Sequence, residues 1–97
     1  MRYEIILAPE AVEDLRRLSA RDRSSIRDVL ARHLRFEPGK ESRSSIKRLR
    51  GISRPQYRLR VGDFRVFYDV DEDAVEILAI VPKTQMEDWL NDVGGHP

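Results

Sequence analysis

Residues 57–70 constrain the fold of this chain more than any other stretch of its sequence. Apolar and polar side chains alternate strictly from Tyr57 to Val61, which is the pattern of a strand with one buried face. Gly62 and Asp63 then supply a two-residue turn, because glycine accepts the positive φ that such turns demand. The sequence therefore predicts a β-hairpin that bends at residues 62 and 63.

The short turn also fixes which residues of the two strands lie opposite one another. The predicted pairs are Val61 with Phe64, Arg60 with Arg65, Leu59 with Val66, Arg58 with Phe67, and Tyr57 with Tyr68. One face of the hairpin then carries only aliphatic and aromatic side chains and belongs to the core. The other face is the candidate functional surface, and it carries Arg58, Arg60, Arg65 and Phe67.

Two arginines placed opposite one another call for an explanation. Like charges at opposed positions of two strands cost roughly 0.2–1 kcal/mol, and a bound anion would remove that penalty. A guanidinium stays charged and offers a planar fork of donors, which suits a phosphate. The alternative is that the side chains extend into water or pair with carboxylates elsewhere, since most exposed charges are simply solvated. The hairpin alone leaves both readings open.

Composition limits the classes of site. The chain has no cysteine, so disulfide frameworks and thiolate metal sites are excluded. Its two histidines, His33 and His96, are far apart, and we expect neither a metal nor a cofactor. No apolar run approaches the roughly 20 residues that span a bilayer, and residues 1–4 lack the start of a secretory signal. We expect a cytoplasmic protein with no membrane association.

The net charge of +1 hides an uneven distribution. Residues 40–65 hold 9 basic and 2 acidic side chains, whereas residues 66–97 hold 1 basic and 8 acidic ones. Such a local excess of positive charge can steer a polyanion toward the central hairpin. Alternatively, the acidic last third of the chain folds across the basic segment and cancels its charge.

The remaining elements are read from periodicity and from cap and turn residues. Residues 2–7 predict a strand, and residues 9–18 and 20–36 predict two amphipathic helices in a hairpin. A loop follows, and residues 46–51 predict a short strand with Leu49 inward and with its basic side chains outward; these are Lys47, Arg48 and Arg50.

The last strand and a short helix complete the chain. Residues 75–81 predict the strand, and Thr84 is the expected N-cap of the helix. The fold class is α+β in the order β-α-α-β-β-β-β-α, with an N-terminal strand and a helical hairpin packed on a small antiparallel sheet. A single domain covers residues 1–90, and residues 91–97 form a flexible tail.

Tight pairing of the last strand extends both faces of the hairpin. The predicted pairs are Val70 with Val75, Asp69 with Glu76, Tyr68 with Ile77, Phe67 with Leu78, Val66 with Ala79, Arg65 with Ile80, and Phe64 with Val81. The arginine face then gains an apolar flank. A cleft with an apolar floor and converging cations would suit a nucleobase next to a phosphate.

The order of elements, together with four short motifs, resembles the RelE/ParE superfamily of bacterial toxins from type II toxin–antitoxin systems. The motifs are Lys47-Arg48-Leu49-Arg50-Gly51, Tyr57-Arg58-Leu59-Arg60, Gly62-Asp63-Phe64-Arg65-Val66-Phe67-Tyr68 and Ile77-Leu78-Ala79-Ile80-Val81-Pro82-Lys83. The resemblance covers the chain up to about residue 90. It implies a cognate antitoxin as partner.

The resemblance also implies a reaction. RelE-like members cut messenger RNA in the ribosomal A site and arrest translation, without a metal, and the basic residues of their central strands correspond here to Arg58, Arg60 and Arg65. The RNA-binding positions expected around them are Lys47, Arg48, Arg50, Phe67 and Lys83.

The sequence departs from that pattern at two places. The arginine and the tyrosine that the resemblance leads us to expect after the last strand are absent, and Thr84 and Leu90 stand there. This departure favours an alternative, a ParE-like toxin that inhibits DNA gyrase without nuclease activity. A third alternative is a domain that has lost toxicity and only binds its antitoxin.

Overall fold

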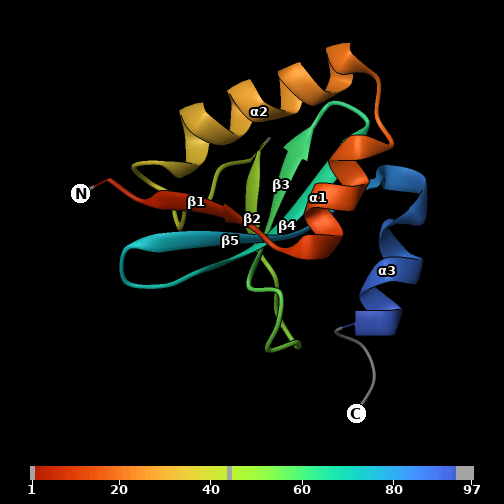
Figure 1. Ribbon diagram of the computed structural model, residues 1–97. Coiled ribbons are helices and arrows are strands. Elements are labelled where there is room, and N and C mark those ends of the chain that lie inside the picture. Colours follow the sequence, from red (N-terminus) through yellow and green to blue (C-terminus); the bar gives the residue numbers. More distant parts are fainter. Residues whose placement is uncertain (1, 44, 94–97) are drawn as a thin grey trace.

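A five-stranded sheet organises the computed structural model of the protein, which describes residues 2–43 and 45–93 (Figure 1). In chain order the elements are β1 (Glu4–Leu7), α1 (Pro9–Arg16), α2 (Ala20–Leu34), β2 (Ile46–Arg48), β3 (Tyr57–Val61), β4 (Phe64–Val70), β5 (Ala74–Pro82), a 3₁₀ turn (Lys83–Gln85) and α3 (Met86–Val93). This order confirms the predicted α+β fold. Residues 94–97, the end of the predicted tail, lie outside the described residues.

The strands lie in the order β1-β5-β4-β3-β2. Neighbouring strands are antiparallel from β2 to β5, as the sequence predicts, whereas β1 joins the edge of β5 in parallel. A parallel partner needs a long connection back to the sheet. Here α1, α2 and three strands separate β1 from β5 in the chain, and Figure 1 shows the two strands side by side.

The two N-terminal helices cover one face of the sheet. Pro9 stands at the start of α1, where its missing N–H costs nothing. Ser19 caps α2, and its Oγ accepts a hydrogen bond of 3.1 Å from the backbone N–H of Asp22. The buried side chains that the helices contribute to the main core are Ala11, Leu15, Ile26, Leu30 and Leu34.

The hairpin at residues 57–70 has the predicted register at every pair. The pairing of β4 with β5 agrees with the prediction only from Tyr68 to Val70, because a β-bulge shifts the register between Phe67 and Tyr68. Leu78 is the extra residue of β5, and Phe67 lies opposite Ala79 instead. The predicted partners of Phe64, Val66, Phe67 and Arg65 on β5 are therefore wrong by one residue. Nothing in an unbroken run of apolar residues marks the position of a bulge.

The bulge sends the side chains of β5 to different cores. Ile80 joins the main core beneath α1 and α2, whereas Ala79 and Val81 join a second, smaller core on the opposite face. That second core is covered by α3 and consists of buried Phe67, Ala79 and Val81 together with Leu49, Met86, Trp89 and Leu90. The sheet is thus covered by helices on both faces. No helix in the described part of the chain is long and apolar enough to cross a membrane.

Candidate nucleic-acid interface

Four basic side chains of β2, β3 and β4 share the sheet face that α3 only partly covers. Lys47 of β2 lies opposite Arg58 of β3, and Arg60 of β3 lies opposite Arg65 of β4. These two pairs are what we call the basic row. Beside the row is an open groove of about 470 Å³, lined by Glu41, Ser42, Arg43, Ser45, Ile46, Lys47, Arg58 and Arg60.

Arg65 shows that the charges of the row converge. Burial lowers the pKa of its guanidinium, and the neighbouring charges of Arg58 and Arg60 lower it further, whereas Asp63 acts in the opposite sense. Arg65 Nη1 donates to the carbonyl oxygens of Gly62 at 2.9 Å and Phe64 at 2.8 Å. The side chain is therefore held against the hairpin turn in a field that an anion would relieve.

No carboxylate of the described residues forms an ion pair with a member of the basic row. The ion pairs among the described residues join Arg16 to Glu13, Arg17 to Asp14, Lys40 to Glu37, and Arg54 to Asp69 and Glu76. Within residues 2–43 and 45–93, no member of the basic row takes part in one. Of the alternatives that the sequence leaves open, internal pairing with carboxylates is thus absent from this part of the chain.

Arg58 differs from the other members of the row because α3 begins above it. Its Nη1 contacts the Sδ of Met86 at 3.8 Å, and its Nε is buried without a hydrogen-bond partner among the described residues. Leaving a buried donor unsatisfied costs about 1–3 kcal/mol, and more for a charged group. Arg60, in contrast, is exposed to solvent. The open end of the row is therefore formed by Arg60 and Arg65.

The structure separates Arg48 from the basic row. Arg48 follows Lys47 on β2 and so points to the other face, where its guanidinium carbon lies 5.0 Å from the centre of the Tyr57 ring. The prediction that Lys47, Arg48 and Arg50 point outward is confirmed by their exposure, but Lys47 and Arg48 lie on opposite faces of the sheet, because successive residues of a strand face opposite ways. Arg50 and Lys83 are exposed beyond the ends of β2 and β5.

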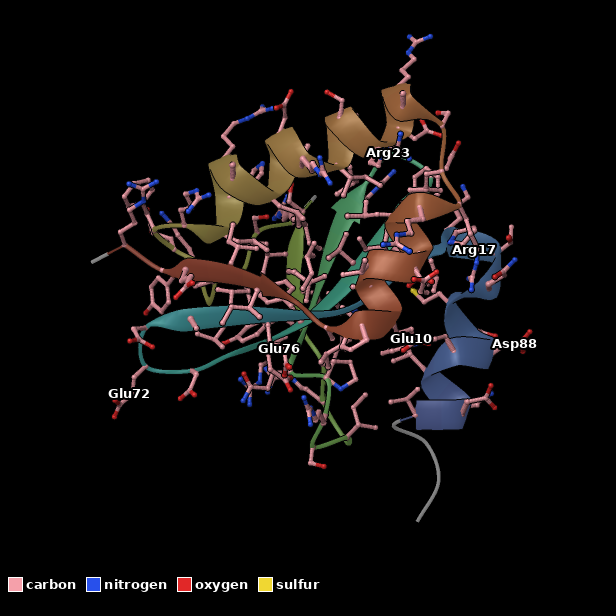
Figure 2. All side chains as sticks on the ribbon, in the orientation of Figure 1. Glu10, Arg17, Arg23, Glu72, Glu76 and Asp88 are labelled. Carbon is pink, nitrogen blue, oxygen red and sulfur yellow. The ribbon has the colours of Figure 1, made fainter. Side chains whose placement is uncertain are left out.

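Phe67 does not form an open cleft floor, so that expectation is wrong. Its exposed fraction is 0%, and the Trp89 ring stacks on it with centroids 4.6 Å apart and planes 14° from parallel. Trp89 Nε1 also lies 3.4 Å from Oε1 of Glu10, on the side of α1 that faces α3 (Figure 2). Burying one aromatic ring against another removes a large apolar area from water. The short C-terminal helix therefore covers the ring that sequence reasoning left open.

Sequence reasoning missed Glu41, which contributes the only carboxylate among the described residues that line the groove. Its Oε1 accepts a 2.7 Å hydrogen bond from the backbone N–H of Arg48. Ser42 holds the same loop, because its N–H donates to Ile46 O at 2.9 Å and its Oγ accepts the N–H of Ile46 at 3.1 Å. The available signal was charge, since Glu41 is one of two acidic residues in the basic segment 40–65.

No metal centre is evident in residues 2–43 and 45–93, where no group of three or more His, Asp or Glu side chains could hold an ion. The groove and the basic row bring together arginine, lysine and, among the described residues, a single carboxylate. Side chains of these types can bind a phosphate, stabilise charge that develops on it and accept a proton.

Comparison with known proteins identifies the family. The family model described as the ParE toxin of type II toxin–antitoxin systems, parDE, matches residues 5–87. No curated protein sequence matches the chain.

Solved structures with the same fold include toxins in complex with their antitoxins. The chain is similar to one in the RelBE2 toxin–antitoxin complex of Mycobacterium tuberculosis, with 25% identity, a TM-score of 0.69, and coverage of 84% of this chain and 99% of that one. It is also similar to one in the archaeal RelE–RelB complex of Pyrococcus horikoshii OT3, with 27% identity, a TM-score of 0.64, and coverage of 86% and 97%.

A third likeness is to the intact Escherichia coli RelBE complex, with 23% identity, a TM-score of 0.57, and coverage of 82% and 95%; it shows the fold alone. The family match spans most of the chain, and the fold is that of RelE-type toxins. The chain therefore belongs to the ParE toxin family of type II toxin–antitoxin systems, within the RelE/ParE superfamily.

Proposed function

We propose that this toxin is a RelE-like endoribonuclease that cleaves messenger RNA in the ribosomal A site and that its cognate antitoxin neutralises it in the cytoplasm. The observation that carries the proposal is the pair Arg60 and Arg65, opposed on a rigid sheet with no carboxylate partner among the described residues. The likeness to RelE-type toxins at 25% and 27% identity supports the same assignment.

The basic row suits attack of a ribose 2′-hydroxyl on the adjacent phosphate. The 2′-oxygen forms a bond to phosphorus, the bond to the 5′-oxygen breaks, and negative charge develops on the phosphate oxygens. Arg60 and Arg65 would stabilise that charge, because fixed donors aimed at a developing anion are worth about 2.7–4 kcal/mol each in enzymes. Lys47 and Arg58 would hold the neighbouring phosphates along β2 and β3.

Glu41 supplies the proton acceptor that the arginines cannot. A guanidinium does not lose its proton in proteins, and no histidine lines the groove. The carboxylate of Glu41 is held by one oxygen to the backbone of Arg48, and its other oxygen can take the 2′-hydroxyl proton. The leaving 5′-oxygen takes a proton from water.

The test is to express the chain without its antitoxin and to map the 5′ ends of a reporter transcript by primer extension. We expect growth arrest with new cuts within codons, and we expect both to disappear in Arg65→Ala. Arg48→Ala removes the same charge from the opposite face, so it serves as the matched control and should still cut. Intact transcripts during full growth arrest would contradict the proposal.

A second candidate function is inhibition of DNA gyrase, which the match to the ParE toxin model favours. The groove and the basic row would then bind a protein or a gyrase–DNA complex. Expression would produce a DNA-damage response with intact transcripts, and purified toxin would inhibit supercoiling by gyrase. The two candidates thus differ in which macromolecule is altered first.

A further inference from the structure

A second groove continues the one beside the basic row, and we call it the α2 groove. Its volume is about 480 Å³, and its lining reaches from the end of α2 to the start of β2. Four residues line both grooves, so the two share a wall; these are Glu41, Ser42, Ser45 and Ile46. The other residues that line the α2 groove are Arg32, His33, Phe36, Glu37 and Lys40. A chain-like ligand on the basic row can therefore extend past Glu41 toward α2.

Phe36 gives the α2 groove an exposed aromatic ring. It follows the end of α2 and, at 62%, is the most exposed large apolar side chain of the described residues. The backbone is fixed on both sides of it, because Arg35 O accepts the N–H of Tyr3 at 2.6 Å and Pro38 O accepts the hydroxyl of Tyr68 at 2.7 Å. A ring on a fixed backbone loses little freedom when a ligand stacks on it.

The α2 groove also carries positive charge. Arg32 is exposed and takes part in no ion pair within residues 2–43 and 45–93. Lys40 pairs with Glu37 at 3.4 Å, but these side chains are 72% and 64% exposed, and such pairs contribute little. The two grooves together are lined by six arginines and lysines and by two glutamates. This excess of positive charge favours an anionic strand along both grooves.

An exposed aromatic ring among cations is the arrangement that binds single-stranded nucleic acid, because bases stack on the ring and cations contact the backbone. The proposed attack sets the direction of the strand. The attacking 2′-oxygen and the leaving 5′-oxygen lie roughly in line on opposite sides of the phosphorus. Glu41 takes the 2′-hydroxyl proton, and it belongs to the wall shared with the α2 groove. The nucleotides on the 5′ side of the cut therefore lie toward Phe36.

We propose that the α2 groove is a subsite for the messenger RNA on the 5′ side of the cut, where one base stacks on Phe36 and Arg32 contacts a phosphate. The subsite rests on the proposed ribonuclease function and states which part of the substrate the toxin holds. Stacking on Phe36 would position the strand without selecting its sequence, since every base has a π face.

The test is a double-mutant cycle on ribosomes programmed with messages that each carry one abasic nucleotide, at one of the first three positions 5′ or 3′ of the cut. We expect Phe36→Ala to slow cleavage of the intact message at least about fivefold, as the loss of one stacked base does. At one 5′ position, the abasic nucleotide should slow the parent by a similar factor and Phe36→Ala no further, because both changes remove the same contact. Additive effects at every 5′ position, or coupling at a 3′ position, would overturn the subsite.

A binding measurement separates failure of the subsite from failure of the proposed function. It uses fluorescence anisotropy of a labelled oligonucleotide of about ten nucleotides, with a 2′-deoxyribose at each position so that it cannot be cut. If the parent cuts no message but binds this strand at least about fivefold more tightly than Phe36→Ala does, the ribonuclease function fails and the subsite stands. If the parent cuts messages and Phe36→Ala binds and cuts equally well, the subsite alone fails. If the parent neither cuts messages nor binds the strand, both fail.

Matched variants separate the aromatic ring and the charge from general effects. Phe36→Tyr keeps the π face and should cut as the parent does, whereas Phe36→Leu keeps an apolar side chain without a ring and should be slow. Arg32→Ala should weaken binding of the strand and lower its dependence on salt. Arg27→Ala, at an exposed residue of α2 that lines neither groove, should do neither. Thermal unfolding of each variant checks the fold, and equal binding by folded Arg32→Ala and Arg27→Ala would contradict the phosphate contact.

Discussion

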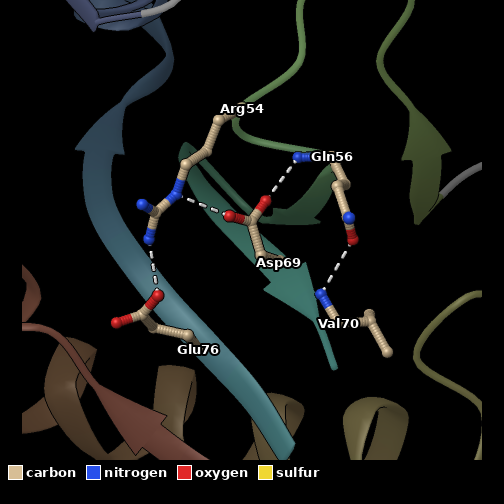
Figure 3. Close-up of polar contacts among 5 residues, drawn as sticks. All are labelled: Arg54, Gln56, Asp69, Val70 and Glu76. Atoms are coloured by element: carbon tan, nitrogen blue, oxygen red, sulfur yellow. Dashed lines mark hydrogen bonds and ion pairs between the residues drawn. The ribbon is translucent and has the colours of Figure 1, made fainter. Parts of the chain in front are cut away.

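The arginines at the two ends of the β3–β4 hairpin lie on the same sheet face but differ in whether they pair with carboxylates. At the end far from the turn, Arg54 of the loop between β2 and β3 reaches the sheet. It donates from Nε to Asp69 at 2.7 Å and from Nη2 to Glu76 at 2.6 Å (Figure 3). At the turn, Arg60 lies opposite Arg65, and neither pairs with a carboxylate in the described residues. Three alternate residues of β4 therefore differ in kind, because Arg65 is a cation, Phe67 is a buried ring and Asp69 is an anion.

The difference separates an arginine that is paired inside the fold from arginines that have no carboxylate partner among the described residues. Both carboxylate oxygens of Asp69 have hydrogen-bond partners inside the protein, because Oδ2 pairs with Arg54 and Oδ1 accepts the backbone N–H of Gln56 at 2.7 Å. The side-chain oxygen of Gln56 in turn accepts the N–H of Val70 at 2.9 Å (Figure 3). This network fastens the loop before β3 to the sheet. At the turn end Arg65 donates to two backbone carbonyl oxygens, but no carboxylate of the described residues pairs with Arg60 or Arg65, so the positive charge there is not balanced by an ion pair.

The largest expected effect comes from replacing one arginine at each end of the hairpin with alanine. Arg60→Ala should reduce RNA cleavage by at least about 100-fold, because it removes one donor from the developing phosphate charge. Arg54→Ala removes a guanidinium from the same face, and its cleavage should stay within about threefold of the parent. The measurement is the rate of reporter transcript cleavage on ribosomes with purified toxin.

The outcome that breaks this comparison is easily recognised. If Arg54→Ala is folded and loses cleavage as completely as Arg60→Ala, then pairing with carboxylates does not separate structural arginines from functional ones. Thermal unfolding of each variant supplies the check on folding.

The next largest effect concerns the stability that the contacts of Asp69 with Arg54 and Gln56 contribute. Asp69→Ala should lower the free energy of unfolding by roughly 2–3 kcal/mol, since hydrogen bonds to charged groups contribute about 1.5–3 kcal/mol and the Gln56 amide loses its acceptor. Asp71→Ala, at an exposed residue two positions later, is the matched control and should change it by less than about 0.5 kcal/mol. Urea denaturation measures both, and equal values would mean that the network adds nothing.

The sequence predicted the hairpin well because its determinants are local. The turn at residues 62–63 and the alternation before it settle every pair between β3 and β4. They do not settle β5, since its apolar residues run without alternation and a bulge at Leu78 leaves no local mark. Consequently the opposed arginines were predicted, but the side chains flanking them on β5 were not.

The candidate site was predicted only where it depends on that hairpin. The burial of Phe67 depends on α3, which docks from residues far along the chain, and the entry of Glu41 depends on a loop whose hydrogen bonds reach across to β2. Neither contact has a periodic signature. The predicted strand at residues 46–51 is also too long, because β2 ends at Arg48 and Leu49 packs beyond that end against the core under α3.

A smaller effect tests whether the hairpin holds its two ends in fixed positions. Tyr68 lies between them on the core face, and its hydroxyl donates to Pro38 O at 2.7 Å. Tyr68→Phe leaves that carbonyl unpaired and should cost about 1–2 kcal/mol at neutral pH. Burial raises the pKa of Tyr68 above its ordinary value of 10.0, so the parent's advantage is complete below about pH 10.

The sign of the pH dependence follows from that shift. The unfolded chain releases the Tyr68 proton above pH 10 and the folded chain retains it, so the parent loses about 1.4 kcal/mol relative to Tyr68→Phe for each further pH unit. The two proteins should therefore approach equal stability near pH 11. Denaturation at pH 8 and pH 11 measures the difference, and a constant difference would show that Tyr68 is free to ionise in the folded protein.

The smallest effect tests most directly the repulsion between Arg60 and Arg65 at the turn end of the hairpin. Arg60→Gln removes the repulsion between Arg60 and Arg65, so it should raise the free energy of unfolding by about 0.2–1 kcal/mol while it reduces activity. Arg54→Gln breaks two ion pairs and should lower that free energy instead. Added phosphate should stabilise the parent, because an anion that binds only the folded state raises its stability, and it should stabilise Arg60→Gln less. A destabilised Arg60→Gln would mean that Arg60 finds a partner within the protein in solution, and the two ends of the hairpin would then no longer differ.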